Sequence, residues 1–157
     1  MSFIIQWIYI LALSLWVGSI VFFSFFTTPA IFSSLPKEMA SQVISTLFPR
    51  YYIVGYAAGG ALLLTTLLEA AFVRHLPLVR LIIVGIMLGS TLYAGMVVRP
   101  QVHDLKVEMK AVAEDSAVGI RLKKQFGKIH GLSVVLNLIV LVGGVFLIGI
   151  LAFRLRL

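Results

Sequence analysis

Four long runs of apolar residues, each almost free of charge, dominate the pattern along this chain. They cover about residues 3–26, 51–72, 78–98 and 131–153. A helix needs about 20 largely apolar residues to cross the hydrocarbon of a bilayer, and the runs lack the period-two alternation of barrel strands. The pattern predicts an all-α fold, an integral membrane antiparallel four-helix bundle that forms a single domain over residues 1–157.

The connection between the third and fourth runs, residues 99–129, continues the helical pattern in both of its halves. Two apolar stripes at helical spacing run along it: Val102, Leu105, Met109 and Val112, followed by Leu122, Phe126 and Ile129. Charged residues occupy the other faces, and the break falls at residues 114–119. We expect spans three and four to continue as an extramembrane helical hairpin, which at about 1.5 Å per residue adds roughly 15–20 Å on that side.

A shorter helix is expected in the first connection, between Pro36 and Leu47. Pro36 stands at a helix start, where its missing N–H is tolerated. Met39, Val43 and Leu47 follow at a spacing of four. We interpret this segment as a short helix lying at the membrane interface.

The composition agrees with a membrane location. Of the 157 residues, 61% are hydrophobic and 12% are charged, and the mean hydropathy is +1.08. A soluble domain of this size could not bury so much apolar surface, so a lipid bilayer is the partner that the composition requires. The chain has no cysteine, which excludes disulfides, thiolate metal sites and cysteine nucleophiles.

The basic residues favour lipid over nucleic acid as a partner. The formal net charge is +7, but Lys and Arg lie at the ends of the apolar runs and in the one long connection. In those places they can contact anionic lipid headgroups, and we expect no nucleic acid binding. A bacterial inner membrane is the expected location, while the distribution of Lys and Arg leaves the orientation open.

Polar side chains gather where span three ends and span four begins. The antiparallel arrangement is expected to bring five of them to one membrane face, at the level of Tyr52: Arg99, His103, His130, Ser133 and Asn137. One interpretation is a site for an anionic or cofactor-like ligand, with Arg99 as its charge partner. A second takes His103 and His130 as ligands of a metal or haem iron, because neutral imidazole is a common ligand. The alternative is a network of hydrogen bonds between helices without a bound ligand.

Glu69 is the one acidic residue inside an apolar run. An ionisable side chain at membrane depth is a candidate for function, here as a proton or cation site. The alternative is that Glu69, which lies near the end of its span, reaches the membrane interface with its side chain or pairs with Arg74 or Arg80.

Two glycine pairs and a tryptophan predict close helix packing. Gly55 and Gly59, and likewise Gly85 and Gly89, are four positions apart, which lets helix backbones approach closely inside a bundle or at a subunit seam. Two such faces are more than one bundle needs, so we expect a homodimer or homotrimer. Trp16 lies in the middle of span one and is expected to pack in the interior.

Several short motifs follow one another in an order that covers nearly the whole chain. They are Trp16-Val17-Gly18-Ser19, Pro29, Phe48-Pro49-x-Tyr51-Tyr52, Arg99-Pro100, and His130-Gly-Leu-Ser133 with Asn137. This order resembles the four-span family of unknown function that includes transmembrane protein 205 of animals. The resemblance implies a four-span fold and, from the link of the animal member to tolerance of platinum drugs, export or trafficking.

The step from Trp16 to Gly18 is also distantly similar to copper resistance protein D and to HemJ-type protoporphyrinogen oxidases, the latter linked to haem. In the oxidase pattern a histidine precedes this tryptophan by two helical turns. Here that position is Tyr9, so the resemblance carries no haem ligand to this chain.

These observations leave three candidate functions. The first is the binding or translocation of a small solute or metal species, in stress or metal tolerance, without covalent catalysis. The second is a haem- or metal-binding membrane redox protein, and the third is a structural or accessory membrane subunit. The sequence has no phosphate loop, catalytic triad, zinc-ligand spacing or paired carboxylates, so an enzyme is not expected and the cofactor is left undefined.

Overall fold

The computed structural model describes residues 3–73 and 77–154, and every regular element in these ranges is helical. In chain order the elements are α1 (Phe3–Val21), η1 (Phe22–Thr27), α2 (Thr28–Ser34), α3 (Lys37–Val73), α4 (Leu78–Tyr93), η2 (Ala94–Val98), α5 (Arg99–Lys110) and α6 (Ala117–Arg154).

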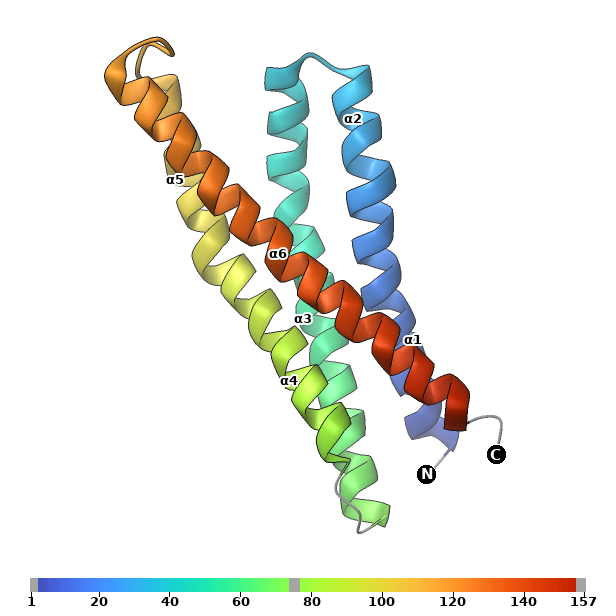
Figure 1. Ribbon diagram of the computed structural model, residues 1–157. Helices are drawn as coiled ribbons and strands as arrows, with labels where there is room; N and C mark the ends of the chain where they lie inside the picture. Colours follow the sequence, from blue (N-terminus) through green and yellow to red (C-terminus); the bar gives the residue numbers. More distant parts are fainter. Residues whose placement is uncertain (1–2, 74–76, 155–157) are drawn as a thin grey trace.

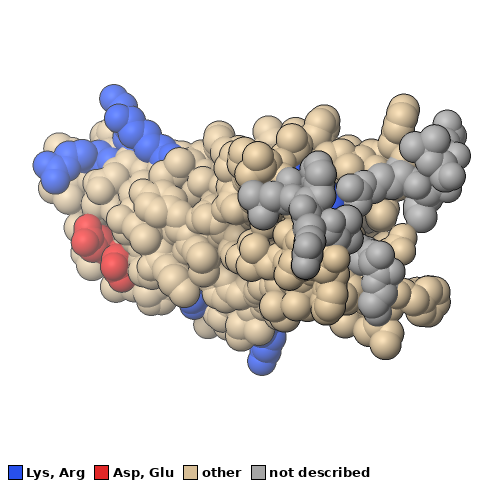
Figure 2. All heavy atoms as spheres, turned by 90° about the horizontal axis from the view of Figure 1, so that it is seen from below, with Lys and Arg blue, Asp and Glu red and all other residues tan. Residues whose placement is uncertain are grey.

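These elements join into four long helices that are each apolar and long enough to cross a membrane. They run over Phe3–Ser34, Lys37–Phe72, Leu78–Lys110 and Ala117–Phe153. Figure 2, which looks from below the view of Figure 1, shows a surface made mostly of residues that are neither acidic nor basic. The chain is therefore an integral membrane protein, as the four apolar runs predict.

The four long helices pack antiparallel as two pairs (Figure 1). The first long helix, α1 to α2, packs against α3, and the third, α4 to α5, packs against α6. The pairs are joined by contacts of α3 with α4 and of α1 with α6. Both chain termini lie at one end of the bundle, and the turns at residues 35–36 and 111–116 lie at the other.

Two of the long helices contain a wide π-type turn that ends two residues before a proline. The segment η1 precedes Pro29, and η2 precedes Pro100. Proline has no N–H to donate and its ring crowds the carbonyl four residues earlier. A π turn relieves this crowding while the helix continues. The segment η2 ends at Val98, so this wide turn lies immediately before Arg99.

The apolar core lies between α1, α3, α4 and α6, in the half of the bundle nearer the termini. Its fully buried members include Tyr9, Leu13, Trp16, Leu62, Val84, Met87, Val140 and Leu147. The expectation that Trp16 packs in the interior is confirmed, since its side chain is 1% exposed. Its indole ring lies against Gly55 and Gly59 of α3, so this glycine pair serves packing within the bundle.

One expectation about the connections needs correction. Residues 36–47 do not form a separate interface helix. Lys37 begins α3, which continues without interruption through Pro49 to Val73. A single proline removes one hydrogen bond, and neighbouring packing lets a membrane helix tolerate it.

The segment 99–129 continues spans three and four as two packed helical arms, as expected, and the structure shows no extramembrane hairpin separate from those spans. The segment consists of α5, continuous with α4 through η2, and the first turns of α6, with a turn at residues 111–116. The predicted helical stripes are correct, because Leu105 and Leu122 are both buried. The charged residues of α5 and of the first turns of α6 made these segments look distinct from the apolar spans in the sequence.

Candidate functional site: a basic cavity between the helix pairs

A cavity of about 300 Å³ lies between the two helix pairs, towards the end of the bundle opposite the termini. All four long helices contribute to its wall. The lining residues are Thr28 and Phe32 of α2, Lys37, Ser41, Ile44, Phe48 and Tyr52 of α3, Arg99, Val102 and Lys106 of α5, and Phe126, His130 and Ser133 of α6.

The lining residues fall into two levels because the helices are antiparallel. Along α3 the lining face runs inward from Lys37 to Tyr52, and along α5 it runs outward from Arg99 to Lys106. Arg99 and Ser133 both lie close enough to Tyr52 to act on its hydroxyl group. We call Tyr52, Arg99, His130 and Ser133 the inner level, and Lys37, Ser41 and Lys106 the outer level.

Four basic side chains line the cavity, and none of the lining residues is acidic. The basic residues are Lys37, Arg99, Lys106 and His130. Among the described acidic residues, none lies within ion-pair distance of Arg99 or Lys106. The cavity is therefore a region of positive potential enclosed by helices.

Lys106 is held by neutral partners. Its ammonium group donates hydrogen bonds to Ser41 Oγ at 2.9 Å and to Ser45 Oγ at 3.1 Å, both on α3. An ammonium group has three donors, so these contacts fix its position and leave one donor and the whole positive charge. The two serines thus aim a half-buried cation at the cavity without neutralising it.

A cluster of aromatic rings lies behind the inner wall, and two of its members, Phe48 and Tyr52, line the cavity itself. Phe23, Phe48 and Tyr51 contact one another, with centroid separations of 4.9–6.3 Å. Tyr52 stacks on Phe48 at 6.0 Å and on Tyr56 at 6.2 Å. This wall gives the cavity an apolar surface beside its charges.

Gly95 in η2 makes room for the tyrosines. A Cβ atom at this position would collide with the Tyr56 hydroxyl and lie 3.0 Å from the Tyr52 ring. The glycine therefore lets α3 and η2 approach closely at the level of Arg99.

The structure brings four of the six predicted ligand-binding residues to the cavity wall. These are Tyr52, Arg99, His130 and Ser133. Asn137 is not in the wall but supports it, since its Oδ1 accepts a hydrogen bond of 2.9 Å from the Tyr51 hydroxyl. His103 is exposed and is not a lining residue.

Sequence reasoning missed the outer level of the cavity. Lys37, Ser41, Ile44, Phe48 and Tyr52 are spaced 4-3-4-4 and form one helix face. That spacing was the available signal, but it is visible only if one helix is assumed to run through Pro49. On α5, Lys106 looked like one of many solvated charges.

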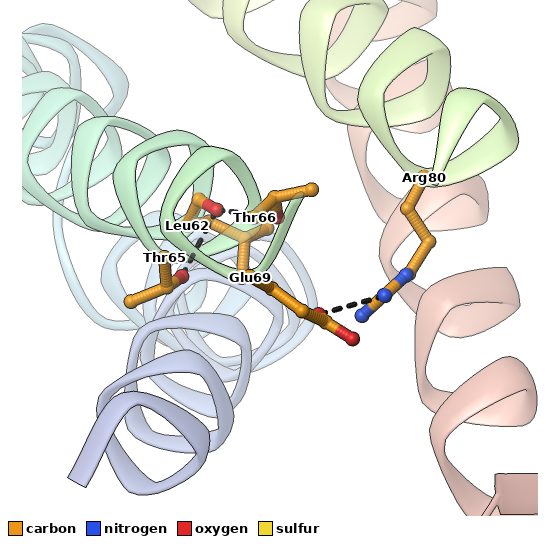
Figure 3. Close-up of polar contacts among 5 residues, drawn as sticks. All are labelled: Leu62, Thr65, Thr66, Glu69 and Arg80. Atoms are coloured by element: carbon orange, nitrogen blue, oxygen red, sulfur yellow. Dashed lines mark hydrogen bonds and ion pairs between the residues drawn. The ribbon is translucent and has the colours of Figure 1, made fainter. Parts of the chain in front are cut away.

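A second polar site lies near the other end of the bundle, where Glu69 of α3 meets Arg80 of α4 (Figure 3). Arg80 Nη2 lies 2.7 Å from Glu69 Oε2, and the two side chains are only 7% and 8% exposed. Of the alternatives for Glu69, pairing with Arg80 is the one observed. The other predicted partner, Arg74, lies outside the described residues.

The Arg80 guanidinium also lies over an aromatic ring. Its central carbon is 5.8 Å from the centroid of the Tyr9 ring, a distance typical of a cation–π contact. Thr65 and Thr66 are buried nearby, but their hydroxyls donate to backbone carbonyls of α3 and not to the ion pair. The ion pair and the tyrosine therefore join three helices: α1, α3 and α4.

The described residues contain no group of three or more His, Cys, Asp and Glu side chains that could hold a metal ion. Of the two predicted metal ligands, His130 lines the cavity and stacks on Phe126 at 5.9 Å. His103 lies outside the lining.

Comparison with known families gives one match. The family described as a domain of unknown function (DUF4149) matches residues 11–111, well over half of the chain. The chain belongs to this family. No curated protein matches it, and no solved structure matches it.

Proposed function

We propose that this member of the DUF4149 family binds a small anionic solute in the basic cavity and translocates it across, or releases it at, the membrane. The observation that carries the proposal is the lining of the cavity, which includes four basic side chains and no acid. An anion lowers its free energy in such a field, and a cation is repelled. The lining therefore favours the first candidate function, the binding or translocation of a small solute. It also favours an anion as that solute over a metal cation.

The other two candidates have weaker support in the geometry. A haem or metal site using both His103 and His130 would need them on one wall, and only His130 is there. A purely structural subunit could use the hydrogen bonds of Lys106 to α3 but would not need its charge, which faces a cavity with no counter-ion on its wall. The aromatic wall also suits an organic solute better than a bare ion.

The proposal is tested with two small probes of the same shape and opposite charge. Benzenesulfonate and phenyltrimethylammonium each join a phenyl ring to a tetrahedral charged group, negative in the first and positive in the second. We expect the purified full-length protein in mild detergent to bind benzenesulfonate more tightly by calorimetry. Arg99→Ala should weaken this binding about tenfold or more, because a hydrogen bond to a charged group contributes roughly 1.5–3 kcal/mol.

Arg50→Ala is the matched control, since Arg50 is exposed on α3 two positions before Tyr52 and does not line the cavity. Equal affinity for the two probes, or equal loss in both variants, would contradict an anion site. Uptake of benzenesulfonate by proteoliposomes then separates a transporter from a protein that only binds.

The oligomeric state and the position of the bundle in the membrane are also proposals. Cβ atoms placed at Gly85 and Gly89 of α4 would meet nothing within 4 Å, so this face is open to a second copy in a homodimer or homotrimer. A monomeric mass by light scattering in several mild detergents would contradict this.

We place the bundle in a bacterial inner membrane with the α5–α6 turn outside the hydrocarbon, and thiol labelling of a cysteine introduced at Asp115 tests that placement.

A further inference from the structure

Resting on the proposed function, we propose that the solute is an organic phosphate, with a doubly charged phosphoryl group at the inner level and an apolar part along the aromatic wall. Three features of the cavity support this more specific ligand. They are the amount of positive charge, the kinds of hydrogen-bond donor at the inner level, and the apolar surface between the two levels.

The charge favours a ligand with more than one negative charge. Lys37, Arg99 and Lys106 supply three positive charges to one cavity of about 300 Å³. A monoanion such as a carboxylate would leave most of this charge uncompensated. A phosphate monoester carries a charge of about −1.5 to −2 at neutral pH, so it compensates more of the field.

The donors at the inner level suit tetrahedral oxygens. Arg99 offers a planar fork of donors that matches phosphate oxygens in a bidentate manner. The hydroxyls of Tyr52 and Ser133 lie at the same level, and a hydroxyl can donate to an additional oxygen. A phosphoryl group presents three acceptor oxygens to these donors, one more than a carboxylate does.

The outer level is positioned to attract the same ligand over a longer distance. Arg99 and Lys106 are seven residues apart on one helix, which corresponds to about 10 Å at 1.5 Å per residue. Between these levels the wall consists of Phe48, Val102 and Phe126. An organic group of phenyl size therefore has an apolar surface to cover while Lys106 adds its charge from the far side.

The closing experiment compares phenyl phosphate with benzenesulfonate, which lacks the bridging ester oxygen, is otherwise similar in size and carries one negative charge fewer. Titrations use the full-length protein in mild detergent at pH 8, where the phosphate monoester is doubly charged. We expect phenyl phosphate to bind at least about tenfold more tightly than benzenesulfonate and than inorganic phosphate, which lacks the apolar part.

Lys106→Met should remove most of the advantage of phenyl phosphate over benzenesulfonate, whereas Lys106→Arg should retain it. Lys110→Met is the matched control, because Lys110 is exposed one turn further along α5 and does not line the cavity. Unchanged circular dichroism and thermal unfolding of Lys106→Met would show that the variant folds. Should it fail to fold, the comparison of probes on the unaltered protein still decides the question.

The outcomes distinguish this inference from the function on which it rests. If both anions bind equally and Arg99→Ala weakens both, the anion site stands and the organic phosphate is wrong. If neither anion binds in a manner that depends on Arg99, both proposals fail.

A phosphate monoester could come from the aqueous phase or from a lipid headgroup. Nanodiscs of phosphatidylcholine, with and without phosphatidic acid, separate the two sources. Competition by phosphatidic acid against phenyl phosphate supports the phosphate site and assigns it to the lipid. Binding of phenyl phosphate that phosphatidic acid does not weaken supports the site and assigns it to a soluble compound.

Discussion

Replacing Glu69 with glutamine is expected to destabilise the folded bundle by roughly 3–5 kcal/mol, because it leaves a buried guanidinium without its carboxylate. Arg80 is 7% exposed, and its Nη2 atom lies 2.7 Å from the Glu69 carboxylate. A glutamine amide can accept a hydrogen bond but carries no charge to balance Arg80. The free energy of unfolding is measured by titration with sodium dodecyl sulfate in mixed micelles.

A double variant provides the control for this prediction. Glu69→Leu combined with Arg80→Met removes both charges and keeps similar side-chain volume. Replacing a buried ion pair by apolar residues is often neutral or stabilising, so the double variant should unfold close to the unaltered protein. A Glu69→Gln protein of unchanged stability would show that the ion pair contributes little, and would favour the alternative of a proton or cation site at Glu69.

The four spans and the buried Trp16 could be predicted because length and apolar composition are local properties. A run of about 20 apolar residues has few other stable environments. The continuity of α3 could not be predicted in the same way. Lys37 and Glu38 make the start of this helix polar, and Pro49 resembles a helix boundary when it is considered alone. Packing against other helices keeps α3 regular through that proline, and such contacts leave no local pattern.

The residues of the inner level could be predicted from the sequence, because an antiparallel arrangement brings the end of span three beside the start of span four. The place of Lys106 in the cavity could not be predicted, since it depends on contacts with Ser41 and Ser45, about 60 positions away in the sequence. His103 shows the limit of helix-face arguments. At about 100° per residue, a face formed by Arg99, Val102 and Lys106 has its centre roughly 70° from position 103, which places His103 at the edge of that face. A spacing of four residues places His103 near Arg99 on the helix. Only the packing of the neighbouring helices determines which side of α5 faces the cavity.

Replacing Gly59 with valine is expected to have the second large effect, a destabilisation of about 1–3 kcal/mol or more, as is typical of an overpacked core. A Cβ atom at Gly59 would lie 2.7 Å from Trp16 Cη2 and 2.8 Å from Leu88 Cδ1. The indole cannot move aside, because Trp16 is 1% exposed and packed among α1, α3 and their neighbours. Unfolding by sodium dodecyl sulfate is again the measurement.

Gly60→Val is the matched control, one position further along the same helix, where a Cβ atom meets nothing within 4 Å. It introduces the same side chain into the same helix but directs it away from the core, so its unfolding should stay close to that of the unaltered protein.

The pair of variants also tests whether the face with Gly55 and Gly59 is an interior surface or a subunit seam. If Gly59→Val changed the mass of the particle in detergent while the monomer unfolded normally, the face would belong to a seam between copies. Loss of stability without a change in mass is the result that packing of Trp16 against Gly59 requires.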